Sequence, residues 1–139
     1  MQKTRNDKEI IEFLKAAGLR ATRQRVAIGQ QLFLSEDRHV TVEQIHIESL
    51  QLGYSVSLAT VYNVLHRFTH AGLLRELAID SGRSYFDTNI SSHQHLYFED
   101  TGKLCDMPGD NIEIKAIPSL PPDTAISRID VIIRVKNKT

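Results

Sequence analysis

The most constraining feature of this sequence is a succession of helix start and stop signals in its first half. Side chains that cap helix N-termini precede four amphipathic segments, and glycines close three of them. The expected caps are Asn6, Thr22, Thr41 and Ser57, and the expected stops are Gly18, Gly53 and Gly72. Gly29 lies within the second segment, where a glycine weakens a helix but need not break it. The spacing predicts four helices with defined ends.

The pattern changes after Gly72, where short apolar segments favour strands. Residues 73–79 and 84–88 flank a turn at 80–83 and predict a hairpin. Helices followed by one hairpin are the order of a winged helix-turn-helix. The first half of the chain is therefore expected to fold as a domain of that kind.

A second hairpin is expected over 95–99 and 103–107, and a final strand over 126–135. All four prolines lie in the tail, which excludes a long helix there. The expected fold class is α+β, with an N-terminal winged helix-turn-helix domain and a small C-terminal α/β dimerisation domain. The expected boundaries are 1–88 for the first domain, 89–92 for a hinge and 93–139 for the second domain.

The second domain is expected to form a homodimer. It is too short to bury a comfortable core of its own, and a bare apolar strand at 126–135 would promote aggregation. Packing back against the helical half is the alternative. A two-fold dimer is favoured because it suits a palindromic DNA site.

Composition narrows the possible classes of protein. No apolar run reaches the roughly 18 residues that a membrane span needs, and no signal-peptide pattern opens the chain. Cys105 is the single cysteine, which excludes an internal disulfide and a four-thiolate zinc site. The expected location is therefore a reducing cytoplasm, without membrane association.

The charge distribution permits nucleic-acid binding. The 17 basic and 17 acidic side chains give a net charge of zero, which by itself argues against a nucleic-acid partner. Residues 1–30, however, carry seven basic side chains against three acidic ones. A neutral protein can bind DNA when its cations share one face, whereas a scattered solvated surface is the alternative.

Residues 54–72 carry the strongest functional signal. A short turn at 54–56 separates two capped helices, as helix-turn-helix geometry requires. The second of these helices is expected over 57–71, and its apolar side chains fall on one face: Val61, Val64, Leu65 and Phe68. Polar side chains flank that face, among which Asn63 can bind adenine through two hydrogen bonds and Arg67 can reach phosphate or guanine.

The candidate DNA contacts come from the end of the first helix, the entry to the second helix and the helix at 57–71. The N-terminal dipole of the second helix favours DNA phosphates. The candidates for contact with double-stranded DNA are Lys15, Arg20, Thr22, Arg23, Arg25, Ser57, Thr60, Tyr62, Asn63 and Arg67. A solvated helix face is the alternative for each of them. His66 and His70 are expected to contact phosphate or to be exposed, rather than to bind metal.

Histidines open the second hairpin in a spacing that suits a metal ion. His93 and His95 are two residues apart, so in a strand both imidazoles point to the same face. Asp87 lies just before them, His39 lies in the loop after the second helix, and Asp106 lies on the returning strand. Imidazoles with carboxylates suit zinc, iron(II) or manganese. Two exposed histidines without a ligand are the alternative.

A small metalloenzyme is a further alternative, because a His-x-His pair beside a carboxylate also occurs in oxygenase and hydrolase sites. The sequence offers no additional general base, nucleophile or glycine-rich cofactor loop. We therefore expect a regulator rather than an enzyme.

Residues 58–65 (LATVYNVL) and 71–73 (AGL) resemble the DNA-reading segment of the ferric uptake regulator (Fur) family. The other matching stretches are 18–25 (GLRATRQR), 39–43 (HVTVE) and 84–87 (SYFD), and the resemblance covers about residues 10–135. It implies a dimeric, metal-responsive repressor or activator. Asn63 stands where the family usually has arginine, which implies an unusual operator.

The resemblance also implies a ligand set. The residues that match the family's hinge-spanning sensory site are His39, Asp87, His93, His95 and Asp106, with aspartate replacing the more usual glutamate at two positions. The implied mechanism is a clamp, in which the ion fixes the angle between the DNA-binding halves of the dimer. Phe98 and Thr101 occupy the positions of the family's Cys-x-x-Cys pair, so no structural cysteine-zinc site is expected.

Residues 62–63, 85–89 and 130–134 are most similar to one branch of the family, the iron response regulators. This resemblance implies haem as an effector, with His93 and His95 as candidate haem ligands, and DNA binding when iron is scarce. Cys105 is followed by Asp106, so the Cys-Pro haem motif of some members is absent. A zinc, manganese or peroxide sensor of the same family is the alternative.

Overall fold

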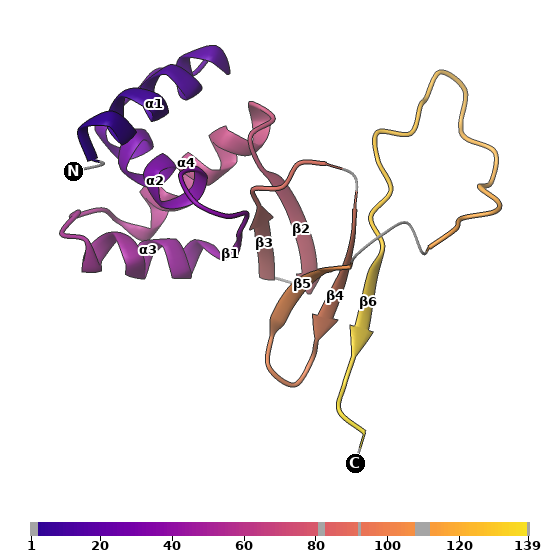
Figure 1. Ribbon diagram of the computed structural model, residues 1–139. Helices are drawn as coiled ribbons and strands as arrows, with labels where there is room; N and C mark the ends of the chain where they lie inside the picture. Colours follow the sequence, from indigo (N-terminus) through magenta and orange to yellow (C-terminus); the bar gives the residue numbers. More distant parts are fainter. Residues whose placement is uncertain (1–2, 81–82, 92, 108–111, 139) are drawn as a thin grey trace. The chain divides into compact units, whose positions relative to one another are not determined.

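The computed structural model describes residues 3–80, 83–91, 93–107 and 112–138 (Figure 1). The chain divides into two compact units, Met1–Ile90 and Ser91–Thr139, which we call unit 1 and unit 2. The elements combine helices with two small sheets, which confirms the expected α+β class. Among the described helices, none has the length and apolar character that a membrane span requires.

Unit 1 contains the four expected helices: α1 (Lys3–Ala16), α2 (Arg23–Phe33), α3 (Val42–Gln51) and α4 (Leu58–His70). Three expected N-caps are confirmed. The side chains of Thr22, Thr41 and Ser57 accept hydrogen bonds from backbone N–H groups in the first turn, at 3.2, 3.1 and 3.1 Å. The expected cap at Asn6 is wrong, because α1 begins at Lys3 and includes that residue.

Glycines end three of the helices as expected. Gly18, Gly53 and Gly72 have φ angles of 80°, 89° and 82°, in the left-handed region that a side chain disfavours. Gly29 has a different role within α2. A Cβ atom at that position would lie 3.0 Å from Cγ2 of Ile10, so the glycine allows α1 and α2 to pack closely.

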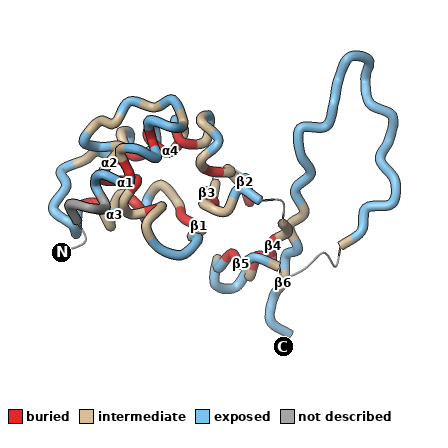
Figure 2. The backbone as a smooth tube through the Cα atoms, turned by 45° about the horizontal axis from the view of Figure 1, so that its top comes forward, coloured by how far each residue is buried: buried red, intermediate tan, exposed pale blue. Residues whose placement is uncertain are grey.

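The core of unit 1 lies among the four helices and against the sheet beside them, where the buried segments gather (Figure 2). Phe68 of α4 is fully buried, and its ring centroid lies 5.5 Å from that of Phe33 on α2. The buried side chains of α4 are the four that its apolar face predicts: Val61, Val64, Leu65 and Phe68. The opposite face of α4 is consequently turned outward.

The sheet of unit 1 has the strand order β1-β3-β2. β2 (Arg75–Asp80) and β3 (Arg83–Asp87) are antiparallel, which confirms the expected hairpin, although residues 81–82 of its turn lie outside the described chain. The loop expected at His39 is wrong. His39–Val40 forms the short strand β1 because it pairs with the free edge of β3, with Val40 opposite Phe86.

Unit 2 is built on a second sheet with the order β5-β4-β6. β4 (Gln94–Phe98) and β5 (Lys103–Met107) form the expected antiparallel hairpin. β6 (Ile132–Val135) pairs with β4 in parallel. The strand expected over 126–135 is therefore too long. The register of β4 with β6 begins at His95 opposite Ile132, and the carbonyl of Val131 accepts a hydrogen bond of 3.2 Å from the His95 N–H, so residues 126–130 lie outside the described strand.

A long segment before β6 has neither regular structure nor cover. Residues 113–130 are exposed throughout and contain no helix, consistent with the effect expected of the prolines (Figure 2). Large apolar side chains in this segment are 42–47% exposed: Ile114, Ile117, Leu120, Ile126 and Ile129. In the described residues of unit 2, by contrast, Tyr97 and Leu104 are the buried apolar side chains. Unit 2 therefore has a small core and a large uncovered apolar surface.

Candidate functional site

The outward face of α4 carries the polar residues that the sequence singles out. Tyr62, Asn63 and Arg67 are exposed, and Thr60 is partly exposed. Ser57 caps the helix, and its hydroxyl also lies 3.0 Å from that of Thr60. Because the apolar face is held in the core, these side chains are presented to solvent as a set.

Part of this set meets the entry of α2 around one open pocket. Thr22 and Arg25 line it from the N-terminal end of α2, whereas Thr60, Asn63 and Arg67 line it from α4. The Arg25 guanidinium donates a hydrogen bond of 2.9 Å to the carbonyl of Arg20, which holds it beside the N-terminus of α2. Two guanidinium groups and a helix N-terminus at one pocket favour an anion. Of the ten candidate contacts, five thus share a surface, and the others, Lys15, Arg20, Arg23, Ser57 and Tyr62, lie outside its lining.

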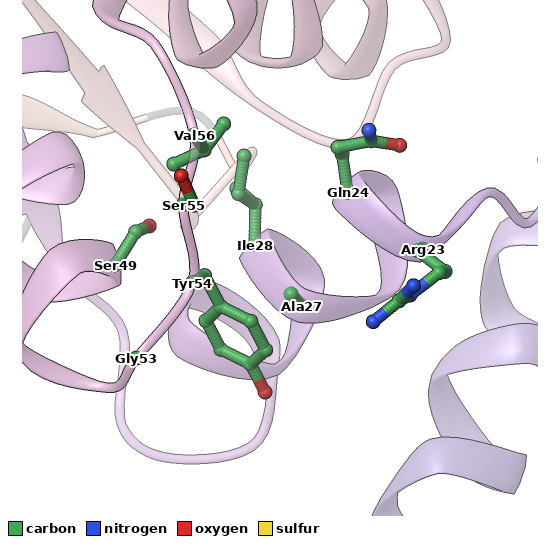
Figure 3. Close-up of a pocket in the computed structure, with 9 residues that line it drawn as sticks. All are labelled: Arg23, Gln24, Ala27, Ile28, Ser49, Gly53, Tyr54, Ser55 and Val56. Carbon is green, nitrogen blue, oxygen red and sulfur yellow. The ribbon is translucent and has the colours of Figure 1, made fainter.

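Arg23 lines a neighbouring cavity of about 390 Å³ between α2 and the segment before α4 (Figure 3). Tyr54, Ser55 and Val56 form the other side of this cavity. The segment is held in place by α3, because Nε2 of His46 lies 3.0 Å from the carbonyl oxygen of Val56. His46 therefore fixes the approach to α4, a role that its sequence context does not indicate.

Unit 1 contributes one histidine and one aspartate of the candidate metal ligands. His39 on β1 lies directly opposite Asp87 on β3, and His39 Nε2 is 3.2 Å from Asp87 Oδ2. Asp87 is 1% exposed, and its Oδ1 accepts a hydrogen bond of 2.8 Å from the backbone N–H of Asn89. We call His39 and Asp87 the unit 1 pair.

Arg38 holds the strand that carries this pair, and the sequence reasoning missed it. Its backbone N–H donates to the Thr88 hydroxyl at 2.8 Å, and its carbonyl accepts from the Thr88 N–H at 3.0 Å. Its guanidinium donates to both carboxylate oxygens of Glu48 on α3, at 3.0 and 2.6 Å. Arg38 thus ties the residues next to His39 and Asp87 to the helix-turn-helix. Opposite charges ten positions apart, with a helix cap between them, gave no recognisable signal.

Unit 2 contributes the remaining candidates, His93, His95 and Asp106, which we call the unit 2 cluster. His95 on β4 lies directly opposite Asp106 on β5. Asp106 Oδ1 lies 3.1 Å from Nε2 of His93 and 3.4 Å from Nε2 of His95. The two imidazole rings are 4.4 Å apart between centroids. The side chains of the cluster therefore converge on one carboxylate oxygen.

The hydrogen bonding of His93 fits a metal ligand. Its Nδ1 lies 2.6 Å from the carbonyl oxygen of Ser91, while its Nε2 faces Asp106. Both ring nitrogens thus face acceptors, but a neutral imidazole has only one N–H to donate. A second proton on the ring or a cation at Nε2 satisfies this arrangement. An N–H donated to a backbone carbonyl, with the other nitrogen on a metal, is the usual pattern of metal-binding histidines.

The unit 1 pair and the unit 2 cluster offer the same kinds of ligand atom. Each of the five residues offers an imidazole nitrogen or a carboxylate oxygen, which zinc, iron(II) and manganese accept. Both sets place a histidine and an aspartate at opposed positions of an antiparallel ladder. Cys105, on β5 beside the unit 2 cluster, is partly buried and is the neighbour of the buried Leu104.

Comparisons with known proteins identify the family. The chain matches the ferric uptake regulator family over residues 16–119. The ferric uptake regulation protein of Shigella flexneri is 36% identical to it over 103 residues, which are 73% of this chain and 70% of that protein.

Solved structures of ferric uptake regulators are similar to the structure of this chain. The ferric uptake regulator from Pseudomonas aeruginosa with manganese is similar with a TM-score of 0.70 and 26% identity, covering 94% of this chain and 98% of that one. The Vibrio cholerae ferric uptake regulator is similar with a TM-score of 0.71 and 25% identity, covering 91% and 98%. The chain therefore belongs to the ferric uptake regulator family, whose members are metal-binding, DNA-binding transcription regulators and not enzymes.

Proposed function

We propose that this protein is an iron- or haem-responsive transcription regulator, in which an ion bound by both units controls how well α4 binds DNA. Asn63 and Arg67 contact base edges or phosphates, and the start of α2 contacts the DNA backbone. The open pocket shared by Thr22, Arg25, Thr60, Asn63 and Arg67 supports this proposal, because it joins hydrogen-bonding and cationic groups from two helices on one surface.

The observation that carries the metal proposal is the hydrogen bonding of His93, whose two ring nitrogens both face acceptors. A divalent ion at Nε2 resolves that conflict and joins His95 and Asp106 to the same centre. We propose that His39 and Asp87 complete the coordination. Binding then links unit 1 to unit 2 and restricts the angle between them, and the ion raises DNA affinity to the extent that it prefers this arrangement.

We propose further that the protein acts as a homodimer on a palindromic operator, with unit 2 as the dimerisation domain. The uncovered apolar side chains of residues 113–130 support this part, because unit 2 buries few apolar groups of its own. A two-fold dimer places two copies of α4 on successive major grooves. Asn63, in place of the usual arginine, gives this operator a sequence of its own.

Haem is the second effector in this proposal, as in the iron response branch that the sequence resembles. His93 and His95 are the candidate ligands, and their rings lie 4.4 Å apart between centroids, so either imidazole could serve as the haem ligand. Haem at this cluster would compete with the divalent ion and release DNA. A Soret band that does not shift, or a shift that survives replacement of both histidines by alanine, would contradict the haem proposal.

A DNA shift experiment tests the function as a whole. An operator is first selected from random DNA with the manganese-loaded protein, and its affinity is then measured with manganese, with a chelator and with added haem. The proposal predicts that chelation weakens binding by roughly 5- to 150-fold, the usual range for coupled sites. If neither the chelator nor haem changes the operator affinity, the proposed function is contradicted.

A further inference from the structure

His66 lies on α4 between two aromatic side chains. Its imidazole centroid is 4.3 Å from the ring centroid of Tyr62, one helical turn earlier on the same helix. On its other side, the centroid lies 6.2 Å from that of Phe86 on β3, in an edge-on arrangement. His66 therefore connects the exposed side of α4 to the central strand of the unit 1 sheet.

Hydrogen bonding at Nε2 of His66 does not account for this position. Nε2 is buried and has no hydrogen-bond partner among the described residues. Burying an unsatisfied nitrogen is unfavourable, so a histidine at this site carries a cost that an apolar ring would avoid. His66 is half-buried rather than exposed, and its contact with phosphate stays a prediction. What the side chain supplies here is a flat ring between two others.

Phe86 stands next to a candidate metal ligand. It is 1% exposed and immediately precedes Asp87, so the two side chains point to opposite faces of β3. β3 is the middle strand of the sheet. Phe86 lies opposite Val40 of β1 on one side and opposite Glu76 of β2 on the other. A shift of β3 that accompanies ion binding at Asp87 therefore moves Phe86 against His66, because a close-packed interior leaves little room for the shift to be absorbed.

Tyr62 is the exposed end of the row of rings formed by Phe86, His66 and Tyr62. Its side chain is 49% exposed on the face that we propose contacts DNA. Tyr62 has one described ring neighbour, His66, so the angle of the phenol depends on that imidazole. A displacement of His66 thus changes where the Tyr62 hydroxyl points.

From these contacts we infer that His66 is a positioning residue, which transmits occupancy of the candidate metal ligand on β3, Asp87, to Tyr62 on the DNA-facing side of α4. The inference rests on the proposed metal-dependent DNA binding and assigns its path within unit 1. It involves no bond to the ion and no base contact by His66 itself.

Fluorine NMR of 3-fluorotyrosine-labelled protein tests the path without DNA. The Tyr62 signal is assigned with Tyr62→Phe, and zinc is used because it is diamagnetic. Zinc is expected to shift this signal in the wild type and in His66→Phe, which keeps the ring, and not in His66→Ala. His70→Ala, at an exposed position of the same helix, is the control and should behave as the wild type. A wild-type Tyr62 signal that zinc leaves unmoved overturns the inference.

DNA binding gives the second readout. The ratio of operator affinities with and without zinc should fall to within about threefold of unity in His66→Ala, from a wild-type ratio of roughly 5- to 150-fold. His66→Phe should keep the wild-type ratio and have an equal or higher melting temperature, and it remains informative if the alanine variant does not fold. If the His66→Ala protein binds zinc and keeps the wild-type ratio of operator affinities, the inference about His66 is overturned and the proposed function is not. If the wild-type protein binds the operator equally well with and without zinc, the proposed function is contradicted instead.

Discussion

His39 lies directly across the β1–β3 ladder from Asp87, with Nε2 3.2 Å from Oδ2. β1 has two residues, so this pairing depends on the few bonds that hold so short a strand. The same opposition recurs between His95 and Asp106 in unit 2. Antiparallel pairing thus sets a histidine beside a carboxylate in each unit.

Removing His39 should weaken metal binding without unfolding unit 1. We expect His39→Ala to lower manganese affinity by at least about tenfold, because one imidazole ligand is lost. Isothermal titration of the metal-free protein measures this. His70→Ala is the matched control, since His70 is exposed on α4 and should leave the affinity unchanged. Equal manganese affinities for His39→Ala and the wild type would exclude His39 as a ligand.

Arg38 should stabilise the site through β1. We expect Arg38→Ala to lower the free energy of unfolding by about 1–2 kcal/mol, since it removes two hydrogen bonds to the Glu48 carboxylate in a half-buried setting. Metal affinity should fall as well, because β1 loses its tie to α3. Urea unfolding and metal titration measure the two effects.

The control for Arg38 is Arg128→Ala, which removes an exposed local pair with Asp130. It should change the free energy of unfolding by less than about 0.5 kcal/mol. If the two arginine variants are equally stable and bind metal equally well, Arg38 does not hold the site.

Asn63 should read DNA sequence, whereas Arg25 should bind DNA without sequence preference. We expect Asn63→Ala to reduce discrimination between the selected operator and altered sites by about 1–3 kcal/mol at the position it contacts. Arg25→Ala should weaken binding to all sequences and reduce the salt dependence by about one counterion. Competition binding at several salt concentrations separates the two effects. An Asn63→Ala protein with unaltered preference would remove this residue from base recognition.

Phe68 should be the side chain of α4 on which folding most depends. It is fully buried against Phe33, so Phe68→Ala should cost about 3–5 kcal/mol of stability in urea unfolding. Leu58→Ala, at a position 42% exposed on the same helix, should cost much less. A loss below about 1 kcal/mol for Phe68→Ala would show that α4 is held by other contacts.

The helical half of the fold could be predicted because its signals are local. Thr22, Thr41 and Ser57 act as caps through bonds to residues three positions away, and such spacing is visible in a sequence. The buried face of α4 follows from its periodicity for the same reason. Asn6 failed as a cap because the helix continues through it to Lys3, and a capping pattern inside a helix looks the same as one at its start.

The features that the sequence did not reveal depend on distant residues. β1 exists because residue 40 pairs with residue 86, and Arg38 reaches Glu48 across the start of α3. The length of β6 is set by its partner strand β4, with which it pairs across 37 positions of the chain, as in His95 opposite Ile132, and not by its own apolar pattern. His66 falls in the same class, because its neighbour Phe86 belongs to another element. The two histidine–aspartate pairs were expected as residue types, but their opposed positions in two ladders were not.

X-ray absorption spectroscopy of the zinc-loaded protein tests most directly the claim that one ion binds both units. The account predicts a first shell of nitrogen and oxygen near 2.0–2.1 Å, with a contribution from three imidazoles and no sulfur. The imidazole contribution should fall by one in His39→Ala, and by one in His95→Ala. An imidazole contribution that either replacement leaves unchanged would contradict a single centre shared by the two units.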